Sequence, residues 1–388
     1  MVLRDRSSAS GEGPSGQPPF VKGVRRYGEA DFSPELSVIT PNLNGRGVLP
    51  AFLDSLAASS AASFELVLVD NGSTDGSVGL LDETKLGRVN ALVVSLDRNL
   101  GFAGASNIGV THSRGRILVF LNNDTTIEPD CLAKMAGALG DRSVGAVQAK
   151  LLTGDGRLID GGGDFIDVLG VPFNLARGER AAGRLTRERE IFSARAAAMA
   201  MERGLYERLG GFDRWFFAAY EDVDLGWRTR GLGYRILLLP TAVVYHKGSL
   251  TSKNMTRGQE LANRNLIALV AKNMEFPLLL LSIAVASGQY YLSLLSAALG
   301  GGGRGLTPQQ LAGPMVALGH GLRRRNAPGA VRGGVRRADL VYRGSVTAHN
   351  AAALLFWVLK YRRSGFSSAA YKEVTQRWVS TKFSRRAG

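Results

Sequence analysis

The chain is short of cysteine and has no apolar leader, and each absence excludes a class of protein. Cys131 is the single cysteine among 388 residues, so no disulfide framework is possible and a reducing compartment is the simplest expectation. The N-terminal stretch MVLRDRSSASGEGPSGQPPF lacks the apolar run of a secretory signal. Its serine, glycine and proline content predicts a disordered leader over residues 1–33, with the first strand near Glu35.

Acidic residues are scarce in one part of the chain only. From Arg304 to Gly388, 13 Arg and 3 Lys face only Asp339 and Glu373, which gives +14 of the total net charge of +15. Residues 1–303 are therefore close to neutral, which excludes a globally basic nucleic-acid binder. The distribution predicts a neutral domain with a basic helical tail over residues 304–388 and no nucleic-acid partner.

Apolar runs of strand length alternate with helical patterns through the first two thirds of the chain. Such runs lie within residues 35–45, 64–77, 90–113 and 117–121. This alternation predicts an α/β domain over residues 34–255 with a mostly parallel sheet. Ligands of such sheets bind beyond the carboxyl ends of the strands, so polar residues at those ends are candidate site residues.

The segment RILVFLNNDTTIEPD ends an apolar strand with three polar residues, Asn122, Asn123 and Asp124. A hard divalent cation takes oxygen ligands and needs few from the protein when a diphosphate supplies the rest. We therefore expect Asp124 to hold Mg²⁺ or Mn²⁺ with a nucleotide diphosphate, and Asn122 to contact ribose or a metal-bound water. The alternative is an Asx-turn before the next segment.

Two further segments favour a nucleotide site. Asp70 ends its strand and can accept a hydrogen bond from a base or ribose, or else close an Asx-turn. The glycines of RNLGFAGASNIG, residues 98–109, let backbone approach a phosphate at a helix start, although their spacing is not that of a dinucleotide site. The expected nucleotide contacts are Thr40, Asn42, Asp70, Asn99, Gly101, Asn107, Asn122 and Asn123.

The segment YEDVDLGWR places Glu221, Asp222 and Asp224 within one helical turn. Like charges so close raise the pKa of at least one of them, and such an acid can act as general base. A helix N-terminus also favours acids, and both explanations can hold at once. The aromatic segment before it suits stacking on a sugar, with Trp215 and Tyr220 as acceptor contacts; core packing is the alternative.

Residues 256–303 form an apolar helical segment, in which positions 276–299 carry no charge over 24 residues. A spanning helix needs about 20 apolar residues, so the length permits one. Pro277 and Gly288 interrupt it and also permit an interfacial helix or a monotopic hairpin. With the basic tail, the segment predicts attachment to an anionic membrane at the cytoplasmic face of the inner membrane. The alternative is a soluble helical subdomain with a basic face.

Taken together and in this order, the motifs resemble inverting nucleotide-sugar glycosyltransferases of family 2, which have the GT-A fold. The resemblance covers roughly residues 36–272 and rests on SVITPNLNG, VDNGSTDGS, RNLGFAGASNIG, FLNNDT, GGFDRWFFAAYEDVDLGWR and VVYHKGS. The pattern is nearest to the bacterial rhamnosyltransferase-like members that build surface polysaccharide. The Gln-x-x-Arg-Trp motif of the cellulose-synthase-like branch is absent.

The resemblance implies a role for each site residue. Asp70 would bind the base, Asp124 and His246 would hold the cation, and Asp222 would be the catalytic base with Glu221 beside it. On its own, a histidine such as His246 is more often structural, and it becomes a ligand candidate only beside Asp124. Many members have Asp at the position of Asn122, so weaker metal dependence is expected.

The implied donor is dTDP-rhamnose, with UDP-hexoses and GDP-mannose next, and the implied acceptor is lipid-linked or a glycan. Two other functions stay open at this point. A nucleotidyltransferase also uses a metal-bound nucleotide, but it needs a basic Gly-rich loop after the first strand, where TPNLNGRG has only Arg46. A scaffold that binds membrane or nucleic acid through its tail would keep binding after loss of Asp124 and Asp222.

Overall fold

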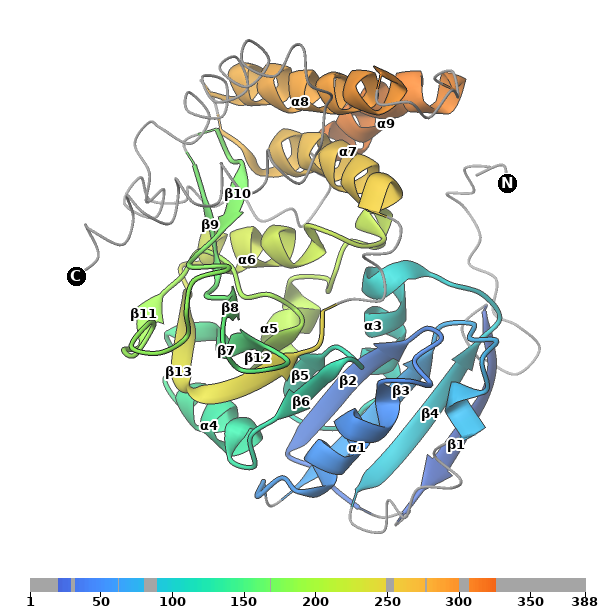
Figure 1. Cartoon of the computed structure of the whole chain (residues 1–388), viewed down its shortest axis with the longest axis vertical. Coiled ribbons are helices and arrows are strands. Elements are labelled where there is room, and N and C mark those ends of the chain that lie inside the picture. Colours follow the sequence, from blue (N-terminus) through green and yellow to red (C-terminus); the bar gives the residue numbers. More distant parts are fainter. Residues whose placement is uncertain are drawn as a thin grey trace.

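The computed structural model of the chain describes residues 20–28, 32–61, 63–79, 89–167, 169–248, 255–275, 278–299 and 307–325. The basic tail beyond Arg325 and the first 19 residues of the predicted leader lie outside this range. Within it, a twisted sheet with helices on both faces forms the body of the molecule. Three long helices, α7, α8 and α9, lie at one end (Figure 1).

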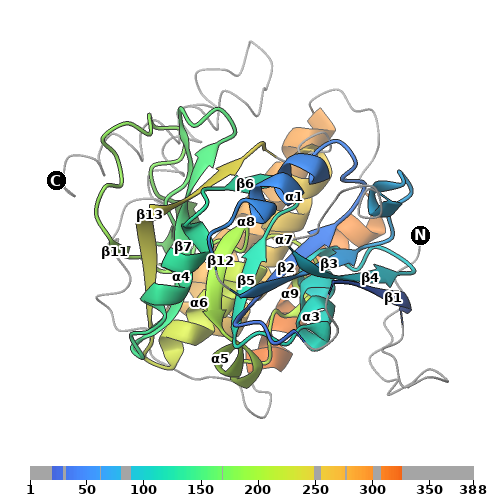
Figure 2. The same ribbon diagram turned by 90° about the horizontal axis from the view of Figure 1, so that it is seen from below.

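The central sheet is mixed, with strand order β1-β4-β3-β2-β5-β12-β7-β13-β11, of which β11 is the short strand Arg189–Glu190. Strands β2 (Leu36–Asn42), β3 (Phe64–Asp70), β4 (Asn90–Leu96) and β5 (Ile117–Leu121) run parallel. Strand β12 (Ala198–Glu202) is antiparallel to β5 and to β7 (Val144–Thr153), while β13 (Arg235–His246) is parallel to β7. Figure 2 shows these strands side by side across the molecule. The predicted α/β class with a mostly parallel sheet is confirmed.

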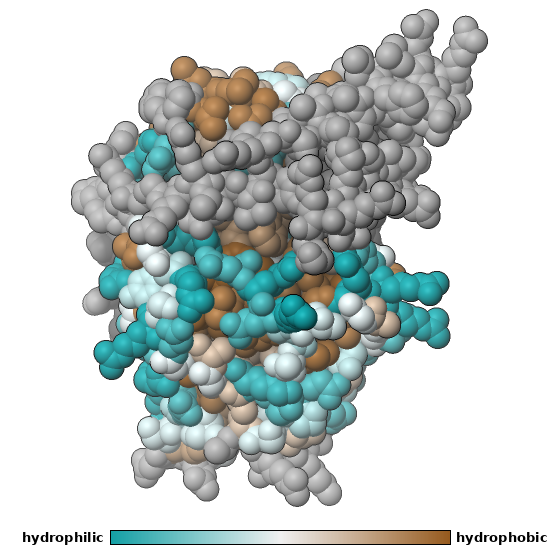
Figure 3. Space-filling model, turned by 90° about the vertical axis from the view of Figure 1, so that its left-hand side faces the viewer, coloured by the Kyte–Doolittle hydropathy of each residue, from teal (hydrophilic) through white to brown (hydrophobic). Residues whose placement is uncertain are grey.

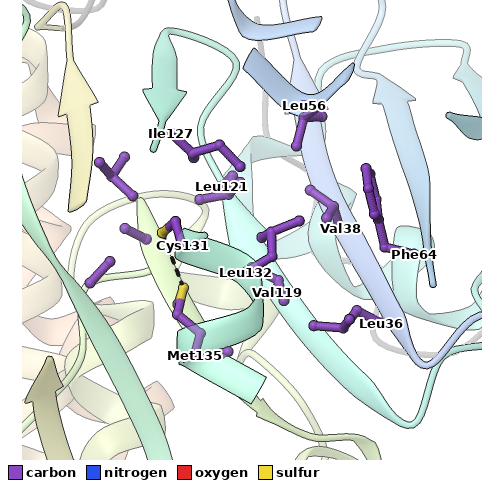
Figure 4. Packing of buried hydrophobic residues seen from close by; sticks show 14 of the residues in the cluster. Leu36, Val38, Leu56, Phe64, Val119, Leu121, Ile127, Cys131, Leu132 and Met135 are labelled. Atoms are coloured by element: carbon purple, nitrogen blue, oxygen red, sulfur yellow. Dashed lines mark hydrogen bonds between the residues drawn. The ribbon is translucent and has the colours of Figure 1, made fainter. Parts of the chain in front are cut away.

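Two hydrophobic layers enclose the sheet because its central strands are apolar on both faces. Helices α1 (Leu49–Ala57) and α4 (Cys131–Ala138) cover one face, where Val38 and Leu66 point. Figure 4 shows this layer, in which the thiol of Cys131 lies 3.9 Å from the sulfur of Met135. Helices α3 (Gly101–His112), α5 (Arg203–Arg208) and α6 (Glu221–Gly231) cover the other face.

The strand β1 (Val21–Tyr27) corrects one prediction. It pairs antiparallel with β4 inside the segment that we expected to be a disordered leader. Its sequence VKGVRRY carries three cations, which is unusual for a strand of a buried sheet. At the edge of a sheet, however, charged side chains reach solvent and block pairing with other chains. The composition of the segment therefore predicted disorder where the structure has an edge strand.

The C-terminal helices are α7 (Met255–Asn273), α8 (Leu279–Leu299) and α9 (Pro308–Arg325). Side chains of α7 pack into one hydrophobic cluster with Phe216, Val223 and Trp227 of the α/β domain. Helices α8 and α9 add Tyr290 and Ala317 to the same cluster. No helix of the described residues is both long and apolar enough to cross a bilayer.

Candidate active site

A pair of side chains at the carboxyl edge of the sheet forms the first part of the site. The short strand β6 (Thr125–Ile127) pairs antiparallel with β13, which sets His246 opposite Thr125. As a result, Nε2 of His246 lies 3.1 Å from Oδ1 of Asp124 and 3.4 Å from Nδ2 of Asn122. The structure thus brings together the two residues that the resemblance named as metal ligands, although they are far apart in sequence.

Asp160 holds His246 from the other side and was missed by sequence reasoning. It lies in strand β8 (Ile159–Gly161), and its Oδ2 is 2.7 Å from Nδ1 of His246. Burial alone would lower the pKa of His246, but the hydrogen bonds to Asp124 and Asp160 outweigh burial and raise it to about 9. Such an imidazole–carboxylate contact fixes the ring of a metal-ligating histidine and makes it a stronger donor.

The residues around Asp124 fit a hard divalent cation that also binds a diphosphate. They offer one carboxylate, one imidazole and one amide at the mouth of the parallel strands. No group of three acidic, histidine or cysteine side chains with the geometry of a complete metal site occurs in the part of the chain that the structure describes. Mg²⁺ and Mn²⁺ commonly take one or two protein ligands together with substrate phosphates and water, so this donor set suits them.

Two adjacent acids at the start of α6, the buried Glu221 and the partly buried Asp222, form the second part of the site. Asp222 accepts hydrogen bonds from the backbone N–H of Ala196 at 3.2 Å and of Val223 at 2.9 Å. Oε2 of Glu221 is buried and has no hydrogen-bond partner among the described residues. Burial and the charge of Asp222 raise the pKa of Glu221 to about 8, and burial also raises the pKa of Asp222.

Arg195 joins the two parts and is a second residue that sequence reasoning missed. Its Nη1 donates to the carbonyl oxygen of Asp160 at 3.3 Å, and its Nε lies 4.0 Å from Oδ2 of Asp164. Burial and the charge of Asp222, opposed by Arg195, raise the pKa of Asp164 to about 6. The signal available in the sequence was IDGGGDF, in which Asp160 and Asp164 flank three glycines.

The loop before the acid pair is strained. Phe217, Ala219 and Tyr220 have φ values of 62°, 71° and 72°, which residues other than glycine rarely adopt. Nδ2 of Asn265, a fully buried residue of α7, lies 2.8–2.9 Å from the carbonyl oxygens of Phe216, Ala218 and Ala219. This loop thus keeps its shape because α7 supplies a donor to it.

The start of α3 contacts this same loop. Gly101 has a φ of 74°, and a Cβ there would lie 2.3 Å from the carbonyl oxygen of Phe217. The N–H of Ala103 donates to that oxygen, and Oδ1 of Asn99 accepts the N–H of Gly101. Asn99 and Gly101 therefore position the loop before the acid pair. We had predicted that they contact the phosphate of a nucleotide.

The remaining predicted nucleotide contacts divide into two groups. Asn42 is fully buried and binds Ser77 at 2.9 Å and Asn123 at 2.7 Å, so it positions the strand end. Oδ1 of Asp70 accepts the N–H of Ser73, which is the Asx-turn contact, and the carboxylate is 8% exposed. These side chains surround the strand ends beside Asp124.

Thr40 and Asn107 lie away from the exposed part of the site. The hydroxyl of Thr40 is buried and has no partner within the described ranges. Oδ1 of Asn107 accepts from the hydroxyl of Tyr206 and from the N–H of Phe212, and its Nδ2 donates to the carbonyl of Phe212. In the structure Asn107 thus joins α3 to Tyr206 and Phe212, and its contact with a nucleotide stays a prediction.

The two predicted acceptor contacts lie in different surroundings. Tyr220 directly precedes the acid pair, and burial and the charges of Asp164 and Asp222 raise its pKa to about 12. Trp215 instead stacks on His320 of α9 at 4.5 Å, and the guanidinium of Arg264 lies 4.4 Å from its ring centre. Trp215 therefore contributes to the packing of the C-terminal helices, which was the alternative expectation.

Asp224, the third acid of the helix start, belongs to the same packing. It is fully buried and binds Arg228 at 2.7 Å, Lys272 at 2.9 Å and Asn273 at 3.0 Å. Burial alone would raise its pKa, but the two cations outweigh burial and lower it. Asp224 is thus paired and attaches α7 to α6, which leaves Glu221 and Asp222 for chemistry.

Comparisons with known proteins show which proteins the chain is similar to. Residues 37–210 match the profile of the family described as glycosyl transferase family 2. A PGL/p-HBAD biosynthesis glycosyltransferase of Mycobacterium bovis is 39% identical over 110 residues, which are 28% of this chain and 43% of that protein. An O-antigen biosynthesis protein of Myxococcus xanthus is 29% identical over 228 residues, which are 56% of this chain and 18% of that protein. The chain thus matches less than half the length of these relatives.

A solved structure has a similar fold at low sequence identity. GalNAc-T7 with UDP, GalNAc and Mn²⁺ superposes with a TM-score of 0.52 at 17% identity, covering 70% of this chain and 52% of that one. This likeness concerns the fold alone. Residues 37–210 are thus similar to glycosyl transferase family 2, and the α/β domain has the GT-A fold that the motifs predicted.

Proposed function

We propose that the chain is an inverting glycosyltransferase that moves a sugar from a nucleoside diphosphate to an acceptor hydroxyl. One observation carries the proposal: contacts run without a break from Asp124 through His246, Asp160 and Arg195 to Asp164, beside the acid pair. A site for a cation and diphosphate and a site for a general base thus adjoin each other. Transfer to a hydroxyl needs both.

The proposed reaction is a single displacement. The acceptor oxygen attacks the anomeric carbon while its proton passes to a carboxylate oxygen of Asp222. The bond between that carbon and the diphosphate oxygen breaks, the nucleoside diphosphate leaves with the bonding electrons, and the configuration inverts. A bound Mg²⁺ or Mn²⁺ would supply charge that neutralises the diphosphate, and Asp124, His246 and Asn122 would hold it.

The environment of each acid favours Asp222 as the base. Two backbone N–H groups donate to Asp222, and such bonds stabilise a carboxylate ion. Glu221 has a pKa of about 8 and an oxygen without a partner among the described residues, so at neutral pH it is largely protonated. A neutral acid cannot accept the proton, but it can donate a hydrogen bond to the acceptor.

The donor class and acceptor are assigned from resemblance. The sequence pattern favours dTDP-rhamnose over UDP-hexoses and GDP-mannose. The Mycobacterium bovis relative is named for PGL/p-HBAD biosynthesis and the Myxococcus xanthus relative for O-antigen biosynthesis. These names support a lipid-linked or glycan acceptor in the synthesis of a cell-surface glycan.

Titration of the purified chain with dTDP, UDP and GDP, with and without Mn²⁺, tests the donor site. We expect one nucleotide to bind in a Mn²⁺-dependent manner, Asp124→Ala to abolish this binding, and Asp141→Ala, an exposed acid paired with Arg235, to leave it unchanged. No binding to a demonstrably folded chain would overturn the proposal and favour a scaffold. Release of pyrophosphate from a nucleoside triphosphate would favour a nucleotidyltransferase instead.

A further inference from the structure

Helix α9 presents its large apolar side chains away from the protein. Its buried face consists largely of small residues, Gly313, Ala317 and Gly321, and a Cβ on Gly321 would lie 2.6 Å from the Cβ of Ala271 on α7. Its outer face carries Leu311 and Met315, of which Met315 is 70% exposed. A helix on the surface of a soluble protein has the opposite pattern, with its large apolar side chains facing the core.

Helix α8 has the same arrangement. Ser282 and Ala286 face inward, while Leu280, Leu281 and Leu292 are exposed, Leu280 to 67%. The two outer faces adjoin, because the hydroxyl of Tyr291 on α8 donates to the carbonyl of Leu311 on α9 at 3.2 Å. Of the 13 exposed large hydrophobic residues among those described, eight lie on these two helices: Leu280, Leu281, Tyr291, Leu292, Leu311, Met315, Val316 and Leu322. An apolar patch beside α8 and α9 is visible at the top of Figure 3.

Arginine side chains lie at the end of this apolar face. Helix α9 ends in Arg323, Arg324 and Arg325, of which the first two are exposed. The sequence beyond it, residues 326–388, adds nine Arg and three Lys against two acids. Helix α8 carries no charged residue along its whole length. Apolar area bordered by arginines matches the two layers of a lipid surface, acyl chains below and anionic headgroups above.

We propose that the outer face of α8 and α9 docks onto an anionic lipid bilayer, with the leucines at the level of the acyl chains and the arginines of α9 among the headgroups. A second copy of the chain would satisfy the apolar area but not the adjacent cations, because those would face each other. The proposal does not depend on transferase activity. If that activity is present, docking would hold the enzyme where a lipid-linked acceptor lies.

Helix α9 also touches the loop that leads to the acid pair. Nε2 of His320 lies 3.1 Å from Oδ2 of Asp213, and the ring of His320 stacks on Trp215. Asp213 and Trp215 start the segment that ends at Glu221. Through His320, helix α9 therefore contacts the segment that precedes the two acids. When α9 is docked on the membrane, this contact fixes the orientation of that segment relative to the membrane.

Sedimentation of the full chain with vesicles tests the proposal. The probes are vesicles of phosphatidylcholine alone and of phosphatidylcholine mixed with phosphatidylglycerol. We expect binding to the mixed vesicles, a loss of roughly tenfold or more in Leu311→Gln/Met315→Gln, and a loss of roughly fivefold in Arg323→Gln, which corresponds to one cation at an anionic surface. Leu232→Gln, a similarly exposed apolar residue at the end of α6, is the matched control and should bind as the parent chain does.

Three results would overturn the proposal. Equal binding of the parent chain and Leu311→Gln/Met315→Gln would mean that the residues after Arg325 bind lipid without this face. Equal binding to neutral and mixed vesicles would remove the role of the arginines. A chain that ignores vesicles but runs as a dimer, which the double substitution converts to a monomer, would assign the face to a second copy.

Discussion

The two halves of the site are built in different ways. The donor half, which we propose binds the cation and nucleotide, includes the ends of β2, β3 and β5, where the chain turns directly from a buried strand into polar residues such as Asp70 and Asp124. The acceptor half, which we propose holds the acceptor and the base, is assembled from distant segments of the chain that contribute Asp164, Arg195 and Asp222. Local motifs therefore mark the strand ends and the acid pair, whereas only tertiary structure brings Asp164 and Arg195 to that pair.

The halves also differ in how their polar groups are satisfied. In the donor half, Asn42, Asn123 and the neighbouring serines bind one another, so hydrogen bonds within the protein hold the strand ends. In the acceptor half, Glu221 has a buried oxygen with no partner in the described part of the chain, and the preceding loop has three positive φ values. Strain of this kind occurs where chemistry requires a particular geometry, and here α7 maintains it.

Removal of the base should have the largest effect. Asp222→Asn keeps the shape of the side chain and can still accept the N–H of Ala196, but it cannot take a proton. We expect transfer to fall by roughly 10³-fold with nucleotide binding unchanged. Glu221→Gln is the matched control and should lose far less. A greater loss in Glu221→Gln than in Asp222→Asn would exchange the roles of the two acids.

Release of the strained loop should come next. Asn265→Ala removes the donor to three loop carbonyls, so Asp222 is no longer held in position. We expect kcat to fall by roughly 10–100-fold with nucleotide binding retained, and hydrogen exchange to accelerate over residues 213–222.

Asn273→Ala is the control for Asn265→Ala. It lies on the same helix but binds Asp224 and the carbonyl of Leu269, and not the loop. It should lower the melting temperature while keeping kcat and the exchange rates of residues 213–222. If both variants lost kcat equally, Asn265 would have only a general role in docking α7.

Weakening of the support for His246 should have a smaller effect on the donor half. Asp160→Asn replaces the carboxylate that orients the ring, and such contacts typically change metal affinity by roughly tenfold or more. The Mn²⁺ concentration needed for nucleotide binding should rise accordingly. Asp155→Asn, a nearby exposed acid bonded to Thr153, should leave it unchanged. An unchanged Mn²⁺ requirement in Asp160→Asn would show that Asp160 does not act through the metal.

The smallest effect concerns stability and pH. The pKa of Glu221 is raised from 4.5 to about 8, so the folded state binds its proton more tightly than the unfolded state does. This contribution is fully present below about pH 4 and is lost as the pH rises towards 8. At pH 8, the free energy of unfolding of Glu221→Gln should therefore exceed that of the parent chain by on the order of 1–2 kcal/mol. The difference should vanish near pH 4; a constant difference across this range would contradict the raised pKa.

The sequence predicted the donor half well because strand periodicity and strand-end polarity are local signals. The strand-end motif predicted the position of Asp124, and the family resemblance implied that His246 lies beside it. Arg195 and Asp164 could not be predicted, since their role arises from a β-bridge between residues 164 and 193 that no local pattern encodes. Trp215 was expected to face a sugar, but nothing in its segment indicated that α9 would supply His320 as a stacking partner. The edge strand β1 was missed because its composition resembles that of a linker.

The hydrogen bonds of Asn265 define which parts of the chain can be exchanged between relatives. A boundary drawn just before α7 would separate the acids from the residue that shapes their loop. A chimera made at that boundary would retain every residue of the acid pair and still lose activity. A boundary after Arg325 keeps Asn265, Lys272 and His320 with the loop they contact. The smallest transferable unit of this chain therefore includes its C-terminal helices.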